Sequence, residues 1–166
     1  QGRTIYDILG PYCLDAPSPS PFTYFPGSVT VDGTRTDNVG VRKKGYLGSL
    51  SNNKPSLKIK FDKYVDDQLY SGMKRMTLNN ARQDPGYLNQ CLSYAQFRAV
   101  GLPAPRCNYA HVTLNGASLG LYVHVESIKK PFIARHFADN DGNLYEGQLS
   151  DFREPWVNTF EKKTNE

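Results

Sequence analysis

The sequence predicts an α+β fold, in which an antiparallel sheet of about five strands accompanies one main helix and a short second helix. Short β-type runs come first, a segment with helical spacing lies near the middle, and a strong hairpin signal follows it. The length of 166 residues suits one domain. Eleven Tyr, eight Phe and 39% hydrophobic residues exclude a disordered chain.

Residues 1–27 are expected to form an extended arm outside the sheet. They contain five prolines with serine and glycine between them. This composition is typical of extended or linking segments rather than of helices or central strands. We therefore place the folded domain at residues 28–166.

Three β-type runs follow the arm and predict an antiparallel meander. They are residues 28–31, 38–44 and 56–61. A polar loop, residues 45–53, separates the second run from the third. The third run alternates apolar and polar residues, which places Lys58 and Lys60 together on the face opposite the aliphatic side chains.

Two helices are predicted, a main one over residues 84–100 and a short one over about residues 131–137. Asp84 is the expected N-cap of the main helix, with Pro85 as its first helical residue. A proline also opens the short helix. The main helix has no acidic residue after its cap, and Gln90 is the polar residue of its first turns.

A β-hairpin is predicted between the two helices. The runs 109–114 and 119–126 are apolar and rich in β-branched residues. Asn115-Gly116 lies between them, and both residues tolerate the positive φ that a two-residue hairpin turn requires. The predicted order is three strands, a helix, two strands and a short helix.

The positive charge of the chain is concentrated in one stretch. The net formal charge is +4, and seven basic residues lie between Arg42 and Lys63 against the single acid Asp62. Such a stretch suits the phosphates of a nucleotide or a nucleic acid, and the alternative is a solvated strand edge protected by lysines. Nucleic acid is the weaker choice, because aromatic residues do not alternate with the lysines as a stacking platform would require.

The cysteines and the hydropathy of the sequence indicate in which cellular compartment the protein could lie. The chain has three cysteines, so a Cys91–Cys107 bond would leave Cys13 unpaired within the chain. That bond is expected only in an oxidising compartment, and buried free thiols fit the sequence equally well. No apolar run reaches the length of roughly 20 residues that spans a bilayer. Neither Cys nor His spacing predicts a metal site.

Eight short sequence motifs, taken together and in order, resemble those of the CotH-like (spore-coat protein H) kinase family. They lie at residues 38–45, 54–61, 78–80 with 84–85, 101–105, 114–116, 120–126, 142–145 and 163–165. The resemblance covers roughly residues 22–166. It implies a protein-kinase-like small lobe, which has the predicted order of strand, loop, lysine-bearing strand, helix and hairpin.

The resemblance implies an ATP site whose candidate residues come from three parts of the chain. They are Gly45, Gly48, Ser49, Ser51, Lys58, Lys60 and Glu126. The glycines and serines would cover the phosphates with backbone and hydroxyl donors. Lys58 would pair with the α and β phosphates, and Lys60 is the second choice. Glu126 would lie at the rim of the nucleotide pocket, where the small lobe meets the large one.

The family resemblance also implies ATP and Mg²⁺ as cofactors and Ser or Thr of a protein as the phosphate acceptor. The catalytic aspartates would follow Glu166 in a C-terminal lobe, to which the end of the chain would be the start of a linker. The chain alone is therefore expected to be inactive. The alternative is a non-catalytic structural or adhesive surface module that contacts a partner protein. Both alternatives imply a secreted or cell-surface protein, and neither indicates an oligomeric state.

Overall fold

A computed structural model describes residues 22–45, 49–147, 150, 152, 154 and 156–164. The chain divides into two compact units, of which one is Phe22–Ser127 and the other includes the segment from Ile128 onward. The predicted site residue Gly48 and the predicted arm as far as residue 21 lie outside the described residues.

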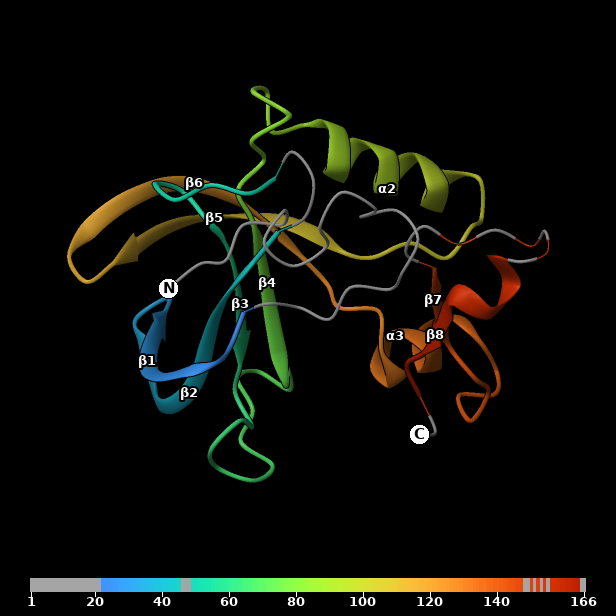
Figure 1. The fold of residues 1–166 in the computed structure, drawn as a ribbon, viewed down its shortest axis with the longest axis horizontal. Coiled ribbons are helices and arrows are strands. Elements are labelled where there is room, and N and C mark those ends of the chain that lie inside the picture. The colour runs from blue at the N-terminus through green and yellow to red at the C-terminus, as the bar shows by residue number, and fades with distance from the viewer. Residues whose placement is uncertain are drawn as a thin grey trace. The chain divides into compact units, whose positions relative to one another are not determined.

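The unit Phe22–Ser127 contains an antiparallel sheet of six strands and one helix (Figure 1). The elements in chain order are β1 (Phe25–Val31), β2 (Thr34–Lys44), β3 (Ser56–Lys60), β4 (Arg75–Asn79), α2 (Asn89–Ala99), β5 (Cys107–Leu114) and β6 (Ala117–Val125). The strand order across the sheet is β1-β2-β3-β4-β6-β5. The predicted meander is confirmed, since β1, β2 and β3 are adjacent and antiparallel.

Strand β4 was not predicted, and it changes the order of the elements. It lies between β3 and β6, so four strands rather than three precede the helix. Met76 and Leu78 are its two buried side chains and face the core. Two alternating apolar residues in so short a strand are a weak signal. The predicted order of three strands, helix and two strands is therefore wrong.

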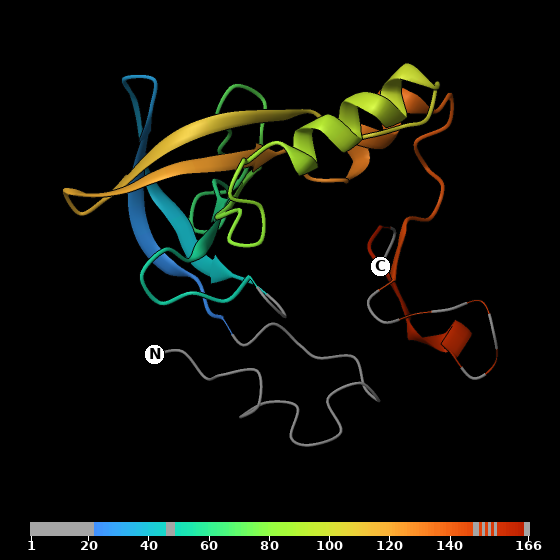
Figure 2. The ribbon, with the colours of Figure 1, turned by 90° about the horizontal axis from the view of Figure 1, so that it is seen from above.

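The sheet curls so that both of its edges contribute to one core. The buried centre of this core consists of Val39, Leu57, Ile59, Phe61, Met76, Leu78 and Tyr122. Val31 from the edge strand β1 and Val112 from the edge strand β5 pack against it. Figures 1 and 2 show the β5–β6 hairpin reaching across towards β1 and β2. The Tyr70 ring stacks on Phe61 with centroids 5.6 Å apart and extends the core beyond the strands.

The main helix begins at Asn89, later than the predicted start at Asp84. Residues 84–87 form a turn instead, in which the Tyr87 N–H donates to the Asp84 carbonyl at 3.0 Å. Tyr87 has a φ of 57°, outside the helical region. The Asp84 carboxylate still accepts a hydrogen bond from the Asn89 N–H at 2.7 Å, so it satisfies one donor of the first turn. Asp-Pro-Gly is also a turn sequence, and here the turn prevails.

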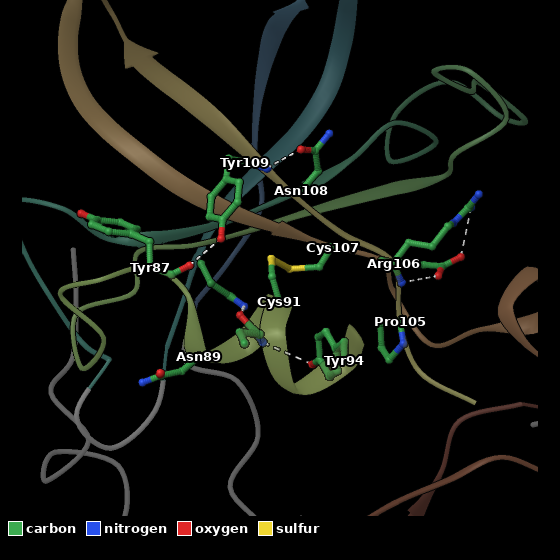
Figure 3. The surroundings of a disulfide bond; sticks show 12 residues. Tyr87, Asn89, Cys91, Tyr94, Pro105, Arg106, Cys107, Asn108 and Tyr109 are labelled. Carbon is green, nitrogen blue, oxygen red and sulfur yellow. Dashed lines mark hydrogen bonds and ion pairs between the residues drawn. A yellow bond between two sulfur atoms is a disulfide. The ribbon is translucent and has the colours of Figure 1, made fainter. Parts of the chain in front are cut away.

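Helix α2 is joined to β5 by the Cys91–Cys107 disulfide bond (Figure 3). No side chain of the helix is buried. Beside the bond, the Tyr109 hydroxyl donates to the Tyr87 carbonyl at 2.8 Å and connects β5 to the turn before the helix (Figure 3). Of the two alternatives that the sequence left open for these cysteines, the structure shows the bonded one.

The predicted hairpin is confirmed, and its turn has the expected chemistry. Asn115 and Gly116 have φ values of 50° and 83°. Both values lie in the left-handed region that a two-residue hairpin turn uses. Strands β5 and β6 are therefore joined as the sequence predicts.

The unit that includes Ile128 onward contains a short helix and a two-stranded sheet. Its elements are α3 (Lys130–His136), β7 (Tyr145–Gly147), the 3₁₀ helix η2 (Trp156–Thr159) and β8 (Phe160–Lys162). The predicted short helix is confirmed as α3. The buried Thr164 hydroxyl accepts a hydrogen bond from the Leu144 N–H at 2.8 Å and closes the β7–β8 pair. None of the helices in the described ranges is long and apolar enough to cross a membrane.

Candidate functional site

Three neighbouring strands place basic side chains on one face of the six-stranded sheet. Lys58 of β3 is paired with Arg42 of β2 and with Thr77 of β4, and directly paired residues share a face. We call this side the basic face, and its half-buried cations are Arg42, Lys44, Lys58, Lys60 and Arg75. Neighbouring strands lie only about 4.8 Å apart. The positive potential of these charges favours an anion on this face.

Lys58 and Lys60 lie on the face opposite the buried Leu57 and Ile59, as predicted. The two lysines differ in their surroundings. Lys60 Nζ is 3.8 Å from the Asp62 carboxylate, which partly offsets its charge. Lys58 is directly paired with Arg42, so two positive charges lie side by side at this point of the sheet. Lys60 is in turn paired with Arg75, so each of the two lysines has a cation as a direct partner.

A chain of hydrogen bonds crosses the sheet from β2 to α2 and includes Asn79 and Tyr94, for which the sequence predicted no role. Lys44 Nζ donates to Asn79 Oδ1 at 2.7 Å. Asn79 Nδ2 donates to Gln90 Oε1 at 2.8 Å, and Gln90 Nε2 donates to the Tyr94 hydroxyl at 3.3 Å. The polar residue predicted on the first turns of the helix therefore reaches Lys44 through Asn79. Asn79 lies in the motif at residues 78–80, one of the eight that resemble the family, and this position could have marked it as a candidate site residue.

Asn80, a buried residue that directly follows β4, holds residues 49–54 of the loop between β2 and β3. Its side-chain amide donates to the Ser49 carbonyl at 3.0 Å and to the Lys54 carbonyl at 2.8 Å. Its backbone N–H donates to the hydroxyl of Ser56, which is also buried, at 3.0 Å. Asn80 therefore ties both ends of the loop segment 49–54 to the sheet.

The predicted loop residues that the structure describes have different roles. Gly45 has a φ of 148°, and a Cβ there would lie 3.2 Å from Leu50 Cδ2. A side chain at this position would be strained, as expected for a loop glycine. The Ser51 hydroxyl accepts a hydrogen bond from the Lys54 N–H at 3.0 Å and so shapes the loop itself. Ser49 is held at its carbonyl, as described above.

Asn80→Ala should lower the free energy of unfolding by about 2 to 3 kcal/mol, because two loop carbonyls lose a buried donor. The same change should speed amide hydrogen exchange in residues 49–54. Chemical denaturation and exchange followed by mass spectrometry measure the two effects. The matched control is Asn53→Ala, since Asn53 is exposed in the same loop. Equal exchange in the two variants would contradict the role given to Asn80.

Lys54, at the end of the loop, is surrounded by aromatic groups. Its ammonium donates to the Tyr87 hydroxyl at 2.6 Å and lies 5.1 Å from the centroid of the Tyr122 ring. The Tyr122 hydroxyl in turn donates to the Pro55 carbonyl at 2.9 Å. Burial, with a smaller effect of Tyr87, raises the pKa of Tyr122 to about 12, so this hydroxyl remains a donor. These contacts assign Lys54 to loop packing.

Glu126 lies directly after β6 and is bound by Arg106. Its carboxylate accepts a hydrogen bond from the Arg106 N–H at 2.9 Å and lies 3.2 Å from the guanidinium group. The next residue, Ser127, has its hydroxyl oxygen 3.5 Å from that of Thr77, the partner of Lys58 in the sheet. The end of β6 therefore reaches the neighbourhood of Lys58. The predicted contact of Glu126 with a nucleotide stays a prediction.

The predicted Mg²⁺ stays a prediction, and the described residues supply the following observations on metal ligands. Among them, no group of three His, Cys, Asp or Glu side chains is arranged to hold a metal ion. Mg²⁺ is usually bound through carboxylates. Asp62, the carboxylate beside the basic face, lies 3.8 Å from Lys60 and 3.7 Å from Lys74. We therefore assign no metal ligand within the described part of the chain.

Comparison with known proteins identifies similar sequences. A family model described as "CotH kinase protein" matches residues 41–166. An inner spore coat protein H-like protein of Bacillus subtilis (strain 168) is 32% identical over 56 residues, which are 34% of this chain and 18% of that protein. Inner spore coat protein H of the same organism is 26% identical over 72 residues, 43% of this chain and 20% of that protein. The matched region thus spans about a fifth of the length of either curated relative.

Proposed function

The chain belongs to the CotH kinase protein family, and from this premise we propose that its basic face binds the phosphates of ATP. The observation that carries the proposal is the pairing of Lys58 with Arg42 and Thr77 on adjacent strands. A lysine on a central strand supplies a point charge for phosphate oxygens. The Arg42 guanidinium group and the Thr77 hydroxyl supply further hydrogen-bond donors on the same face.

The loop that Asn80 holds supports this proposal. It connects β2 with β3, the two strands that carry Arg42 and Lys58. Its described segment, residues 49–54, is tied to the sheet at both ends, and a segment that is already fixed loses less conformational entropy when its backbone donors meet a ligand. In the proposed complex Gly45, Ser49 and Ser51 lie next to the phosphates, and Lys58 contacts them from the sheet.

Phosphoryl transfer is proposed for the complete protein. A Ser or Thr hydroxyl oxygen of a protein substrate would attack the γ-phosphorus, the bond to the β–γ bridging oxygen would break, and ADP would leave. The hydroxyl proton would pass to a carboxylate base. Mg²⁺, when bound, neutralises phosphate charge in this chemistry. Its ligands and the base are expected outside the described residues.

We also propose a secreted or coat-associated location. The two curated relatives carry the name of an inner spore coat protein. The Cys91–Cys107 bond fits such a location, because disulfides persist in oxidising compartments.

Lys58→Ala should weaken the binding of Mg-ATP by about 10- to 100-fold, the loss expected when a hydrogen-bonded charge is removed. Isothermal titration calorimetry of the chain measures this change. The matched control is Lys43→Ala, which removes the same charge. Lys43 is paired with the buried Leu57 and therefore faces away from the basic face. Equal losses in the two variants would contradict the proposed site, and absent ATP binding by the unmodified chain would favour a non-catalytic surface module.

A further inference from the structure

We infer that Asn79 and Gln90 are positioning residues that hold the Lys44 ammonium on the basic face as a second phosphate-contacting cation. This inference rests on the proposed function, because it concerns a further cation of the same face. The ligand class is a nucleoside di- or triphosphate, whose neighbouring phosphates can meet two separated cations.

The direction of each hydrogen bond in the Lys44 chain is fixed by chemistry. An ammonium group only donates, so Asn79 must turn its oxygen towards Lys44 and its nitrogen towards Gln90. Gln90 then accepts from Asn79 through its oxygen and donates to the Tyr94 hydroxyl through its nitrogen. Both amides therefore have one orientation. A chain of this kind defines the position of the ammonium rather than filling space.

The acceptor that Asn79 offers to Lys44 is neutral, whereas Lys60 and Lys74 of the same unit lie near carboxylates. Lys60 lies 3.8 Å from the carboxylate of Asp62, and Lys74 lies 3.1 Å from that of Asp67. Asn79 accepts the hydrogen bond of the Lys44 ammonium through an amide oxygen, which is a neutral group. A hydrogen bond from an ammonium to a phosphate is stronger than one between neutral groups. Asn79 thus orients the Lys44 ammonium through a neutral acceptor, and a phosphate oxygen would be the stronger acceptor for the same group.

Holding a lysine in advance also reduces the cost of binding. A free lysine side chain samples many rotamers, and part of this freedom is lost when a ligand immobilises it. The hydrogen bond to Asn79 restricts the side chain before the ligand arrives. Gln90 can serve as the outer support because the next residue, Cys91, is bonded to Cys107 of β5. The first turn of α2 is therefore attached to the sheet at the point where the support is needed.

Lys44 and Lys58 are placed to contact different phosphates of one ligand. Lys44 is paired with Ser56, two residues before Lys58 on β3, so the two lysines are diagonal neighbours on one face. Diagonal neighbours lie roughly 7 to 8 Å apart. Two flexible side chains with this separation can converge on neighbouring phosphates.

Binding of Mg-ATP and of inorganic triphosphate to the chain tests the inference. Lys44→Ala should weaken both by about tenfold. Asn79→Ala should weaken both by roughly three- to tenfold. Asn79→Asp should bind at least as weakly as Asn79→Ala, since it keeps an acceptor for Lys44 but adds an opposing charge. In a Lys44→Ala background, Asn79→Ala should have no further effect, because the residue it positions is gone.

The controls separate this inference from the proposed function. Lys43→Ala removes the same charge from the other face, and thermal unfolding shows whether each variant is folded. The inference is overturned if Lys44→Ala matches Lys43→Ala while Lys58→Ala still loses binding, and the proposed function then survives. It is also overturned if Asn79→Ala weakens binding equally with and without Lys44. If triphosphate binds but ATP does not, a Lys44 effect on triphosphate supports the inference while the nucleotide site fails. If neither Mg-ATP nor inorganic triphosphate binds to the unmodified chain, the inference and the proposed function are both overturned.

Discussion

Phe61→Ala is expected to lower the free energy of unfolding by about 3 to 5 kcal/mol, the largest effect of any single substitution considered for this chain. Phe61 follows β3 and is 0% exposed in the centre of the core. Its ring stacks on Tyr70, and its N–H donates to the Lys74 carbonyl at 2.9 Å. Truncation would leave a cavity between the sheet and the segment that contains Tyr70. Urea denaturation followed by circular dichroism measures the loss.

Phe25→Ala is the matched control for that prediction. Phe25 lies on the edge strand β1 and is 61% exposed, so its replacement should change the free energy of unfolding by no more than about 0.5 kcal/mol. Comparable losses for the two phenylalanines would mean that the core does not lie where the structure places it.

Removal of the disulfide should have the second largest effect. The double variant Cys91→Ser/Cys107→Ser should lose about 3 kcal/mol, the value expected for a closed loop of this size. The bonded residues are 16 apart in sequence. Because α2 buries no side chain, its amides should also exchange faster once the bond is gone. Denaturation and hydrogen exchange measure the two results.

The disulfide prediction has its own control in Cys13→Ser, because that cysteine is not part of the bond. If the α2 amides remain as protected in the double variant as in the control, packing rather than the bond holds the helix. Contacts other than the disulfide bond would then have to fix Gln90 and the first turn of α2.

The local parts of the fold were predictable because they depend on neighbouring residues. Asn115-Gly116 specifies its hairpin through backbone conformation alone. The alternation around Lys58 specifies which side chains share a face. The start of α2 was misplaced because Asp84 precedes both a proline and a glycine, and the same residues can begin a helix or form a turn.

The candidate site was predictable only in part, because it depends on which strands become neighbours. Lys58 could be predicted as a site residue from the sequence of its own strand alone. The contact of Lys44 with Asn79 joins residues 35 apart and exists only because β4 lies inside the sheet, beside β3. No strand was predicted there, so Gln90 could not be connected to a lysine of β2 from the sequence. The role of Asn80 in holding the loop was missed for the same reason.

An NMR titration of the ¹⁵N-labelled chain with Mg-ATP tests the central claim most directly. If the basic face binds the phosphates, the largest amide shift changes should occur in residues 42–45, 56–60 and 77–80, and Lys58→Ala should reduce them. Inorganic triphosphate should affect the same strands. Absence of shift changes at millimolar ATP, or changes confined to residues from Ile128 onward, would contradict the account.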